Sequence, residues 1–362
     1  MLLLPAQDAR GQIAEFLGPH ITETMSYDGQ IVGTGRIGGI VMDNYGYLYV
    51  ANQDEGLWKI YPSGKVKLFA EGFYGSGSGA ALGNGDLLWS SFAADKIFRI
   101  ERDGTVHLFA SEGLDGPVGM AATRSGDIYA VNYRSNYISH ITPDGVVTEF
   151  VRDDRFDGPN GISADREGNL YVVNLGNTLV LKVTPEGEIS EIAKLPGTAN
   201  AHVAVAGDVL YVTQIWSHVV LRVEMDGNYQ VVAGDGTMGT EDGPTGTSTV
   251  RYPNGIAVGA GTVYINTLRG DMIAAHPGII DVRAIHFPTP QNAFLRAFEH
   301  GGMSALRAKF EQASHLQEVP IDRLAPAVYS IGTQFLNRGH IEAGMSLTEW
   351  MFEADANAAR KH

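Results

Sequence analysis

The sequence contains no cysteine among its 362 residues. This absence excludes disulfide bonds, thiolate metal sites and cysteine nucleophiles, and it fits a reducing compartment. No apolar run approaches the ~20 residues that a membrane span requires. The opening Met-Leu-Leu-Leu-Pro also lacks the basic region and the cleavage site of a signal peptide. We therefore expect a cytoplasmic protein that makes no membrane contact.

Basic residues are scarce, with 26 Lys and Arg against 41 Asp and Glu, for a net charge of −15. Such a chain repels polyanions, so we expect no nucleic-acid partner. Three catalytic motifs are also missing: the G-x-S-x-G elbow, H-E-x-x-H, and a glycine-rich phosphate loop leading into a helix. The sequence thus gives no support to serine-hydrolase, zincin or nucleotide chemistry. The hydrophobic fraction of 44% indicates a globular protein.

Glycine is abundant, and its spacing reveals a repeat. Only five of the 45 glycines lie in residues 288–362. Turn glycines recur at intervals of 40, 41, 42 and 40 residues, at Gly64, Gly104, Gly145, Gly187 and Gly227. A second series opens each unit, with a histidine in the fifth place: Gly39, Gly79, Gly119, Gly161, His202 and Gly255. Short strands and turns repeating about every 40 residues are typical of propeller blades.

The repeat predicts an all-β six-bladed propeller of four-stranded blades over residues 11–287, followed by a small C-terminal α-helical extension over residues 288–362. The six blades are expected to start near residues 36, 76, 116, 158, 199 and 252. Residues 11–17 match the fourth-strand pattern of residues 104–110, so we expect an N-terminal strand to close the last blade. The alternative is that Ile279–Ile285 supplies that strand.

The junction of the fifth and sixth units carries a family resemblance. V-V-A-G-D-G-T-M-G-T-E-D-G-P, from Val231 to Pro244, and then Y-P-N-G-I-A-V, from Tyr252, resemble the NHL-repeat consensus. The propeller is similar to those of gluconolactonases, paraoxonases and strictosidine synthase. The resemblance implies a fold more firmly than a function, because this propeller hosts hydrolases, lyases, synthases and binding modules.

The last 75 residues have a helical pattern. Apolar residues recur at helical spacings after Pro290 and again after Pro320. The stretch from Phe335 to Ala359 resembles one tetratricopeptide-like hairpin. One or two such hairpins do not form a stable solenoid. We therefore expect the tail to pack on the propeller or to join two copies of the chain into a homo-oligomer.

The residues just before the innermost strands ring one mouth of the channel in a propeller. Here they are Gly38, Ser78, Val118, Asn160, Ala201 and Asn254. In the calcium-dependent hydrolases that the chain resembles, a Glu, two Asn and an Asp hold the metal. Asn160 matches one of these ligands, Asn254 is an extra candidate, and the other places hold no suitable oxygen ligand. A divalent cation such as calcium is thus an expectation that rests on Asn160 and Asn254, and either asparagine also suits a simple turn.

A second ring of neutral polar residues follows the second strands: Asn52, Ser91, Asn132, Asn174, Gln214 and Thr267. They either cap loop backbones or contact a ligand, for which we single out Asn132 and Asn174. The next residues are bulky: Phe92, Tyr133, Leu175, Ile215-Trp216 and Leu268-Arg269. Phe92, Tyr133, Trp216 and Arg269 would then border a largely apolar pocket for a small-molecule substrate.

His202 replaces a glycine at a channel position. A neutral imidazole there would serve as the acid or base, unless it is a structural histidine bonded to a neighbouring blade. The favoured hypothesis is an enzyme of the propeller hydrolase and lyase group that acts on a small apolar metabolite, for example a lactone or ester. The alternatives are a non-catalytic NHL-type binding or scaffold module and a strictosidine-synthase-like enzyme that forms a carbon–carbon bond.

Overall fold

The computed structural model describes residues 23–43, 45–61, 65–72, 75–259, 262–270, 278–286, 303–305, 307–308 and 349. The chain divides into two compact units. One comprises Glu23–Ile285, and the other comprises Met1–Thr22 together with His286–His362.

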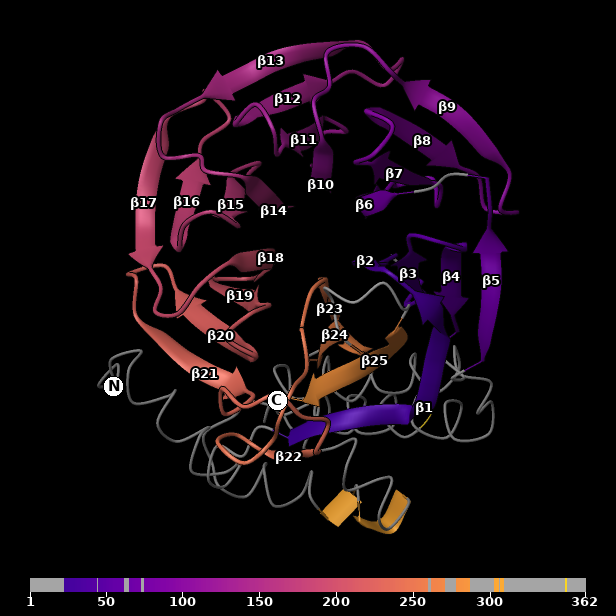
Figure 1. Ribbon diagram of the computed structural model, residues 1–362, viewed down its shortest axis with the longest axis vertical. Coiled ribbons are helices and arrows are strands. Elements are labelled where there is room, and N and C mark those ends of the chain that lie inside the picture. Colours follow the sequence, from indigo (N-terminus) through magenta and orange to yellow (C-terminus); the bar gives the residue numbers. More distant parts are fainter. Residues whose placement is uncertain are drawn as a thin grey trace, which may run out of the picture. The chain divides into compact units, whose positions relative to one another are not determined.

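Five four-stranded antiparallel sheets follow one another along the chain and are arranged as the blades of a ring (Figure 1). In each sheet, the first strand in the sequence lies nearest the axis and the fourth lies outermost. Their strands are β2 (Ile37–Met42), β3 (Leu48–Asn52), β4 (Gly56–Ile60) and β5 (Val66–Ala70); β6 (Ser76–Ala81), β7 (Leu87–Ser91), β8 (Lys96–Ile100) and β9 (Val106–Ala110); β10 (Pro117–Ala122), β11 (Ile128–Asn132), β12 (Tyr137–Ile141) and β13 (Val147–Arg152); β14 (Pro159–Ala164), β15 (Leu170–Asn174), β16 (Leu179–Val183) and β17 (Ile189–Lys194); β18 (Asn200–Ala206), β19 (Val209–Gln214), β20 (Val219–Glu224) and β21 (Tyr229–Ala233).

The sixth blade joins the two ends of the propeller sequence. From the axis outward its order is β23 (Ile256–Gly259), β24 (Thr262–Arg269), β25 (Gly278–His286), β1 (Glu23–Gly35) and the short β22 (Gly243–Pro244). An N-terminal strand therefore closes the ring, as predicted, but that strand is β1. The predicted segment 11–17 lies outside the described residues, and Ile279–Ile285 belongs to β25, the third strand of this blade. The six-bladed fold is confirmed.

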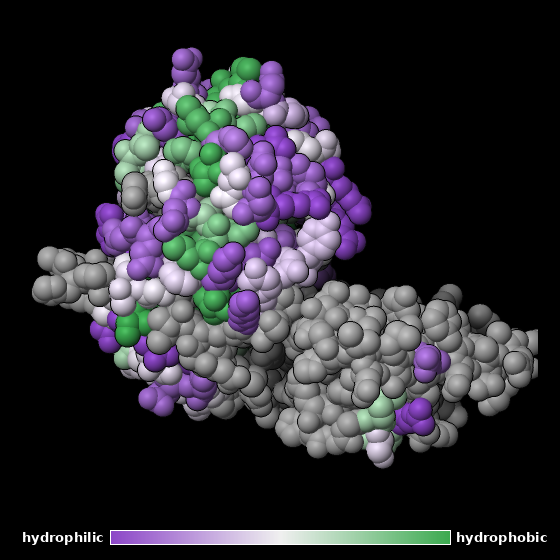
Figure 2. All heavy atoms as spheres, turned by 90° about the vertical axis from the view of Figure 1, so that its right-hand side faces the viewer, coloured by the Kyte–Doolittle hydropathy of each residue, from purple (hydrophilic) through white to green (hydrophobic). Residues whose placement is uncertain are grey.

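The hydrophobic core consists of layers between neighbouring blades. Tyr49 of the first blade packs with Leu87 and Trp89 of the second, and Val172 of the fourth packs with Val131 of the third. Because each layer joins two consecutive repeats, no blade buries its apolar faces alone. The outer strands are partly exposed, and the side of the ring that carries β5 and β9 mixes hydrophilic with apolar side chains (Figure 2).

The regular turns explain the spacing of the glycines. Gly145 and Gly187, which precede the outermost strands of two blades, have φ angles of 86° and 87°. A residue with a Cβ rarely adopts such angles, so glycine recurs at this turn in successive blades.

Most of the predicted helical extension lies outside the described residues. Residues 303–305, 307–308 and 349 are helical. Within the described part of the chain, no helix is long and apolar enough to cross a membrane.

Candidate functional site

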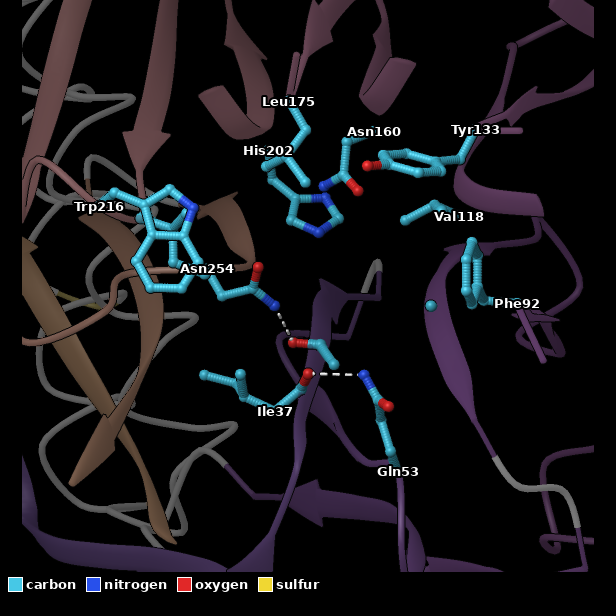
Figure 3. A pocket seen from close by; sticks show the side chains of 13 residues that line it. Ile37, Gln53, Phe92, Val118, Tyr133, Asn160, Leu175, His202, Trp216 and Asn254 are labelled. Atoms are coloured by element: carbon cyan, nitrogen blue, oxygen red, sulfur yellow. Dashed lines mark hydrogen bonds between the residues drawn. The ribbon is translucent and has the colours of Figure 1, made fainter. Parts of the chain in front are cut away.

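A cavity of about 320 Å³ lies at one mouth of the propeller channel (Figure 3). All six blades contribute to it, either at the start of the innermost strand or just after the second strand. The lining residues are Ile37, Gly38, Gln53, Gly77, Phe92, Val118, Tyr133, Asn160, Leu175, His202, Ile215, Trp216 and Asn254. None of these residues is an acid, a lysine or an arginine, so the cavity favours an uncharged ligand.

A bulge at the start of the innermost strand turns residues toward the mouth. In the first blade the register shifts between Ile37 and Ile40, and in the third it shifts between Pro117 and Met120. The same shift occurs in the second, fourth and fifth blades. Residues within a bulge leave the regular ladder and are re-aimed. This places Gly38 and Val118 in the cavity lining.

The register corrects the predicted mouth ring in the second blade. Gly79 pairs with Trp89 as Ile40 pairs with Val50, so the position of Gly39 is taken by Ser78. The residue that reaches the mouth cavity from this blade is accordingly Gly77, and Ser78 does not line it.

His202 occupies the position that is glycine in four of the other blades. Its backbone N–H donates to Thr213 Oγ1 over 3.0 Å, and its side chain borders the cavity. The residue is 6% exposed. Among the described residues, no group hydrogen bonds to the imidazole nitrogens. Burial lowers the pKa of His202 from 6.5 to about 4, which keeps the imidazole neutral near pH 7.

Asn160 and Asn254 are anchored to the neighbouring blade in the same way. Asn160 Nδ2 donates to the carbonyl oxygen of Ala201 over 2.6 Å, and Asn254 Nδ2 donates to that of Gly38 over 2.7 Å. A carbonyl oxygen only accepts, so these contacts fix which end of each amide is the nitrogen. Each side chain keeps its Oδ1 and a second N–H for a ligand. Figure 3 shows both asparagines and His202 among the side chains that line the cavity.

The wall of the cavity is largely apolar and aromatic. Phe92 and Tyr133 meet edge to face, with ring centroids 5.8 Å apart. Their backbone N–H groups donate to the carbonyls of Gly75 and Gly116, both over 2.9 Å. The residues that follow the second strands are thus held against the segment before the innermost strand. Trp216 is 43% exposed and extends the apolar wall at the rim.

Three of the predicted ligand-contacting residues do not line the cavity. Asn132 and Asn174 are fully buried at the ends of second strands, where Asn132 Nδ2 donates to Ser139 Oγ and Asn174 Nδ2 donates to the carbonyl of Arg155. The Arg269 guanidinium pairs with Asp281 at 2.7 Å. Gln53 lines the cavity but is not among the predicted residues, although it follows the second strand of its blade as Phe92 does in the next blade.

The residues present do not fit a calcium site. A hard divalent cation needs several oxygen ligands, usually with carboxylates among them. The cavity offers the Oδ1 atoms of Asn160 and Asn254 but no carboxylate. Within the described residues, no cluster of three or more His, Asp or Glu side chains is placed to hold a metal ion.

The sequence matches the virginiamycin B lyase family over residues 33–233, which is more than half of the chain. No curated protein sequence matches the chain. The family match says nothing of NHL repeats or of a tetratricopeptide-like tail, which remain predictions.

Several solved structures share the fold. A catalytically inactive histidine-to-alanine variant of virginiamycin B lyase from Staphylococcus aureus, with quinupristin, is 19% identical with a TM-score of 0.51, over 69% of this chain and 80% of that one. A putative gluconolactonase is 15% identical with a TM-score of 0.56, over 74% and 92%. An auxiliary nutrient binding protein from Bacteroides ovatus is 19% identical with a TM-score of 0.58, over 74% and 77%. At these identities the similarity shows the propeller fold alone.

Proposed function

The chain belongs to the virginiamycin B lyase family, and from this premise we propose that it is an enzyme that cleaves a small, largely apolar ester or lactone at the channel mouth. His202 is the proposed base. The observation that carries the proposal is a buried, neutral imidazole that borders a cavity and has no hydrogen-bond partner among the described residues. A base held in this way is free to accept a proton from a bound substrate.

The proposed reaction is an elimination. His202 removes a proton from a carbon that lies between a carbonyl group of the substrate and the carbon that bears the ester oxygen. The C–H electron pair forms a double bond between these two carbons as the bond from the second carbon to the ester oxygen breaks, and the acyloxy group leaves as a carboxylate. No water adds to the substrate.

The two asparagines suit the developing charge. Each Nδ2 group spends one N–H on a neighbouring carbonyl, Ala201 or Gly38, and keeps the other. That second N–H is a donor for the carbonyl oxygen of the substrate, which becomes more negative as the proton leaves. Because the amides are fixed in place, they need little reorganisation during the reaction. Asn160 and Asn254 are therefore proposed as substrate-binding residues.

The lining supports an uncharged substrate with an apolar or aromatic part. Phe92, Tyr133 and Trp216 supply the apolar surface, and no acid, lysine or arginine lines the cavity. A charged ligand would lose its hydration there without gaining an opposite charge.

A panel of neutral esters and lactones, with quinupristin among them, tests the proposal by mass spectrometry. Elimination from a cyclic ester gives a product of the same mass as the substrate, whereas hydrolysis adds one water. We expect turnover without incorporation of heavy oxygen from labelled water, and loss of that turnover in His202→Gln. Tight binding without any product would support the NHL-type binding module instead. A product that joins two substrates would support the strictosidine-synthase-like alternative.

We propose that the remaining features fit a small-molecule enzyme of the cytoplasm. The net charge of −15 opposes nucleic-acid binding, and the absence of cysteine suits a reducing compartment. The proposed homo-oligomer contact through the C-terminal helices falls mostly outside the described residues. Its test is the mass of the protein in solution with and without residues 288–362.

A further inference from the structure

A second cavity of about 250 Å³ lies along the axis of the ring. The innermost strands of all six blades line it, from the level of Ser78 and His202 to the ends of the strands. The exposure of the lining rises in that direction, since Ala204 is buried whereas Val205 and Val258 are half-buried. The cavity is therefore open toward the face opposite the mouth.

His202 borders both cavities, and among the described residues it is the one that the two linings share. The mouth cavity is mostly apolar, whereas the axial cavity is mostly polar. The imidazole thus separates an apolar substrate chamber from a polar channel. Its two nitrogens allow it to exchange a proton with either side.

The polar character of the axial cavity follows from the topology. Each innermost strand is an edge strand, paired with the second strand on one side and facing the axis on the other. Edge strands expose backbone N–H and C=O groups that require partners. Ser163 Oγ accepts one of them, the N–H of Val205, over 3.1 Å. Water satisfies such groups in polar cavities large enough to hold it, and this cavity has room for several molecules.

We propose that this axial channel holds a file of water that carries the proton from His202 to the face opposite the substrate. The inference rests on the proposed function, because elimination of an ester to a carboxylate releases one proton per turnover. The imidazolium formed at the mouth gives its proton to a channel water, which leaves a neutral imidazole and a hydronium ion. Bound substrate closes the mouth during this step, so the channel provides the route to solvent.

Exchange of the His202 Cε1 proton for deuterium, followed by mass spectrometry, tests the channel without any substrate. Two substitutions narrow the channel from different blades: Ala204→Leu on β18 and Val258→Phe on β23. Ala204 is buried and Val258 is half-buried, and if one variant fails to fold the other still serves. Thr148→Phe, on the exposed outer strand β13, is the matched control. Every protein in this comparison also carries Val118→Phe, which narrows the mouth as bound substrate does.

We expect both channel variants to slow the exchange at His202 roughly tenfold, as closing a route to solvent does. Thr148→Phe should leave it unchanged, and the exposed His107 provides an internal reference in every sample. An exchange rate that neither channel substitution changes in this background would overturn the proposal, because the proton would then leave through the narrowed mouth. Slow exchange in the channel variants of a protein that cleaves no ester would establish the channel and reject the proposed function.

Once a substrate is known, Ala204→Leu and Val258→Phe alone, without Val118→Phe, give a second readout, which is steady-state kinetics. They should lower kcat and leave KM unchanged, since they act on proton release and do not touch the mouth. A change in KM at constant kcat would contradict the proposal.

Discussion

Asn254 Nδ2 donates to the carbonyl oxygen of Gly38 over 2.7 Å, which joins the last blade to the first at the mouth of the channel. Asn266 Nδ2 donates to the same oxygen over 2.8 Å. Two donors therefore converge on one carbonyl where residues 216 and 228 positions apart in the sequence meet. The asparagine proposed to bind substrate is also part of the closure of the ring.

Substitution of Asn254 should reduce stability in a pH-dependent manner. Asn254→Ala removes one of the two donors and should cost about 1–2 kcal/mol of unfolding free energy. Asn254→Asp should cost more at pH 7, because the introduced carboxylate faces the Gly38 carbonyl oxygen. Below its pKa the introduced carboxyl is protonated and donates again, so the extra loss should shrink at pH 4. Urea unfolding at both pH values, each relative to the unsubstituted protein, measures this. An Asp variant as stable as the Ala variant at pH 7 would show that the contact does not form.

Replacement of His202 should separate chemistry from folding. His202→Gln should lower the rate of ester elimination about a hundredfold or more, as loss of a general base does. His202→Gly restores the residue of Gly161, whose place in the neighbouring blade is the same, so we expect a folded protein without activity. Circular dichroism and the elimination assay together test this. Retained activity in His202→Gly would remove His202 from the mechanism.

The pKa of His202 predicts both an activity limb and a stability slope. Burial lowers this pKa from 6.5 to about 4, so kcat/KM of the free enzyme should fall only below about pH 5. Between pH 6.5 and about 4 the unfolded chain binds a proton at His202 that the folded chain does not. Stability contributed by this group should therefore decrease as the pH falls, by about 3 kcal/mol in all.

Unfolding free energies measured across this pH range, for the unsubstituted protein and His202→Gln, isolate the contribution of His202. The variant should lose less stability on acidification. If the unfolding free energy of both proteins fell equally with pH, or if kcat/KM fell near pH 6.5, the imidazole would be solvated.

Local signals in the sequence were sufficient to predict the fold. The turns need glycine at positive φ, as at Gly145 and Gly187, so their spacing marks the blades. The register of the strands within a blade was harder to predict. Gly77-Ser78-Gly79 offers three small residues in a row, and the bulge in this strand is not visible in residue types. The predicted closing strand, residues 11–17, precedes the observed one, β1, because residues 11–17 carry the same alternating pattern as any outer strand.

The candidate site was predictable in part. His202 stood out because it breaks a repeat, and Phe92 and Tyr133 because they follow second strands. Asn132 and Asn174 each end a second strand, but their side chains hydrogen bond to loop backbone and do not line the cavity. Whether an asparagine contacts a loop or a cavity depends on partners such as Ala201, 41 residues from Asn160, and no local pattern encodes that distance.

Truncation of the aromatic wall should weaken substrate binding more than catalysis. Trp216→Ala removes apolar surface from the rim, and we expect KM to rise about tenfold with little change in kcat. Tyr229→Ala is the matched control, because Tyr229 is 48% exposed on β21 and does not line the cavity. Steady-state kinetics of both variants provide the measurement. An equal effect of the two substitutions would place the substrate elsewhere.

Removal of divalent cations should not destabilise the propeller. Asn160 and Asn254 each spend an amide N–H on a carbonyl and offer one neutral oxygen, and no carboxylate lines the cavity. Two neutral oxygens give a hard cation too few ligands to compensate for lost hydration. We therefore expect the same thermal midpoint in chelator and in millimolar calcium, measured by thermal shift together with metal analysis of the purified protein. Asn160→Asp supplies the positive control, since an added carboxylate should introduce a calcium-dependent rise in the midpoint. A rise of several degrees with calcium in the unsubstituted protein would show that ligands other than these two asparagines hold a metal.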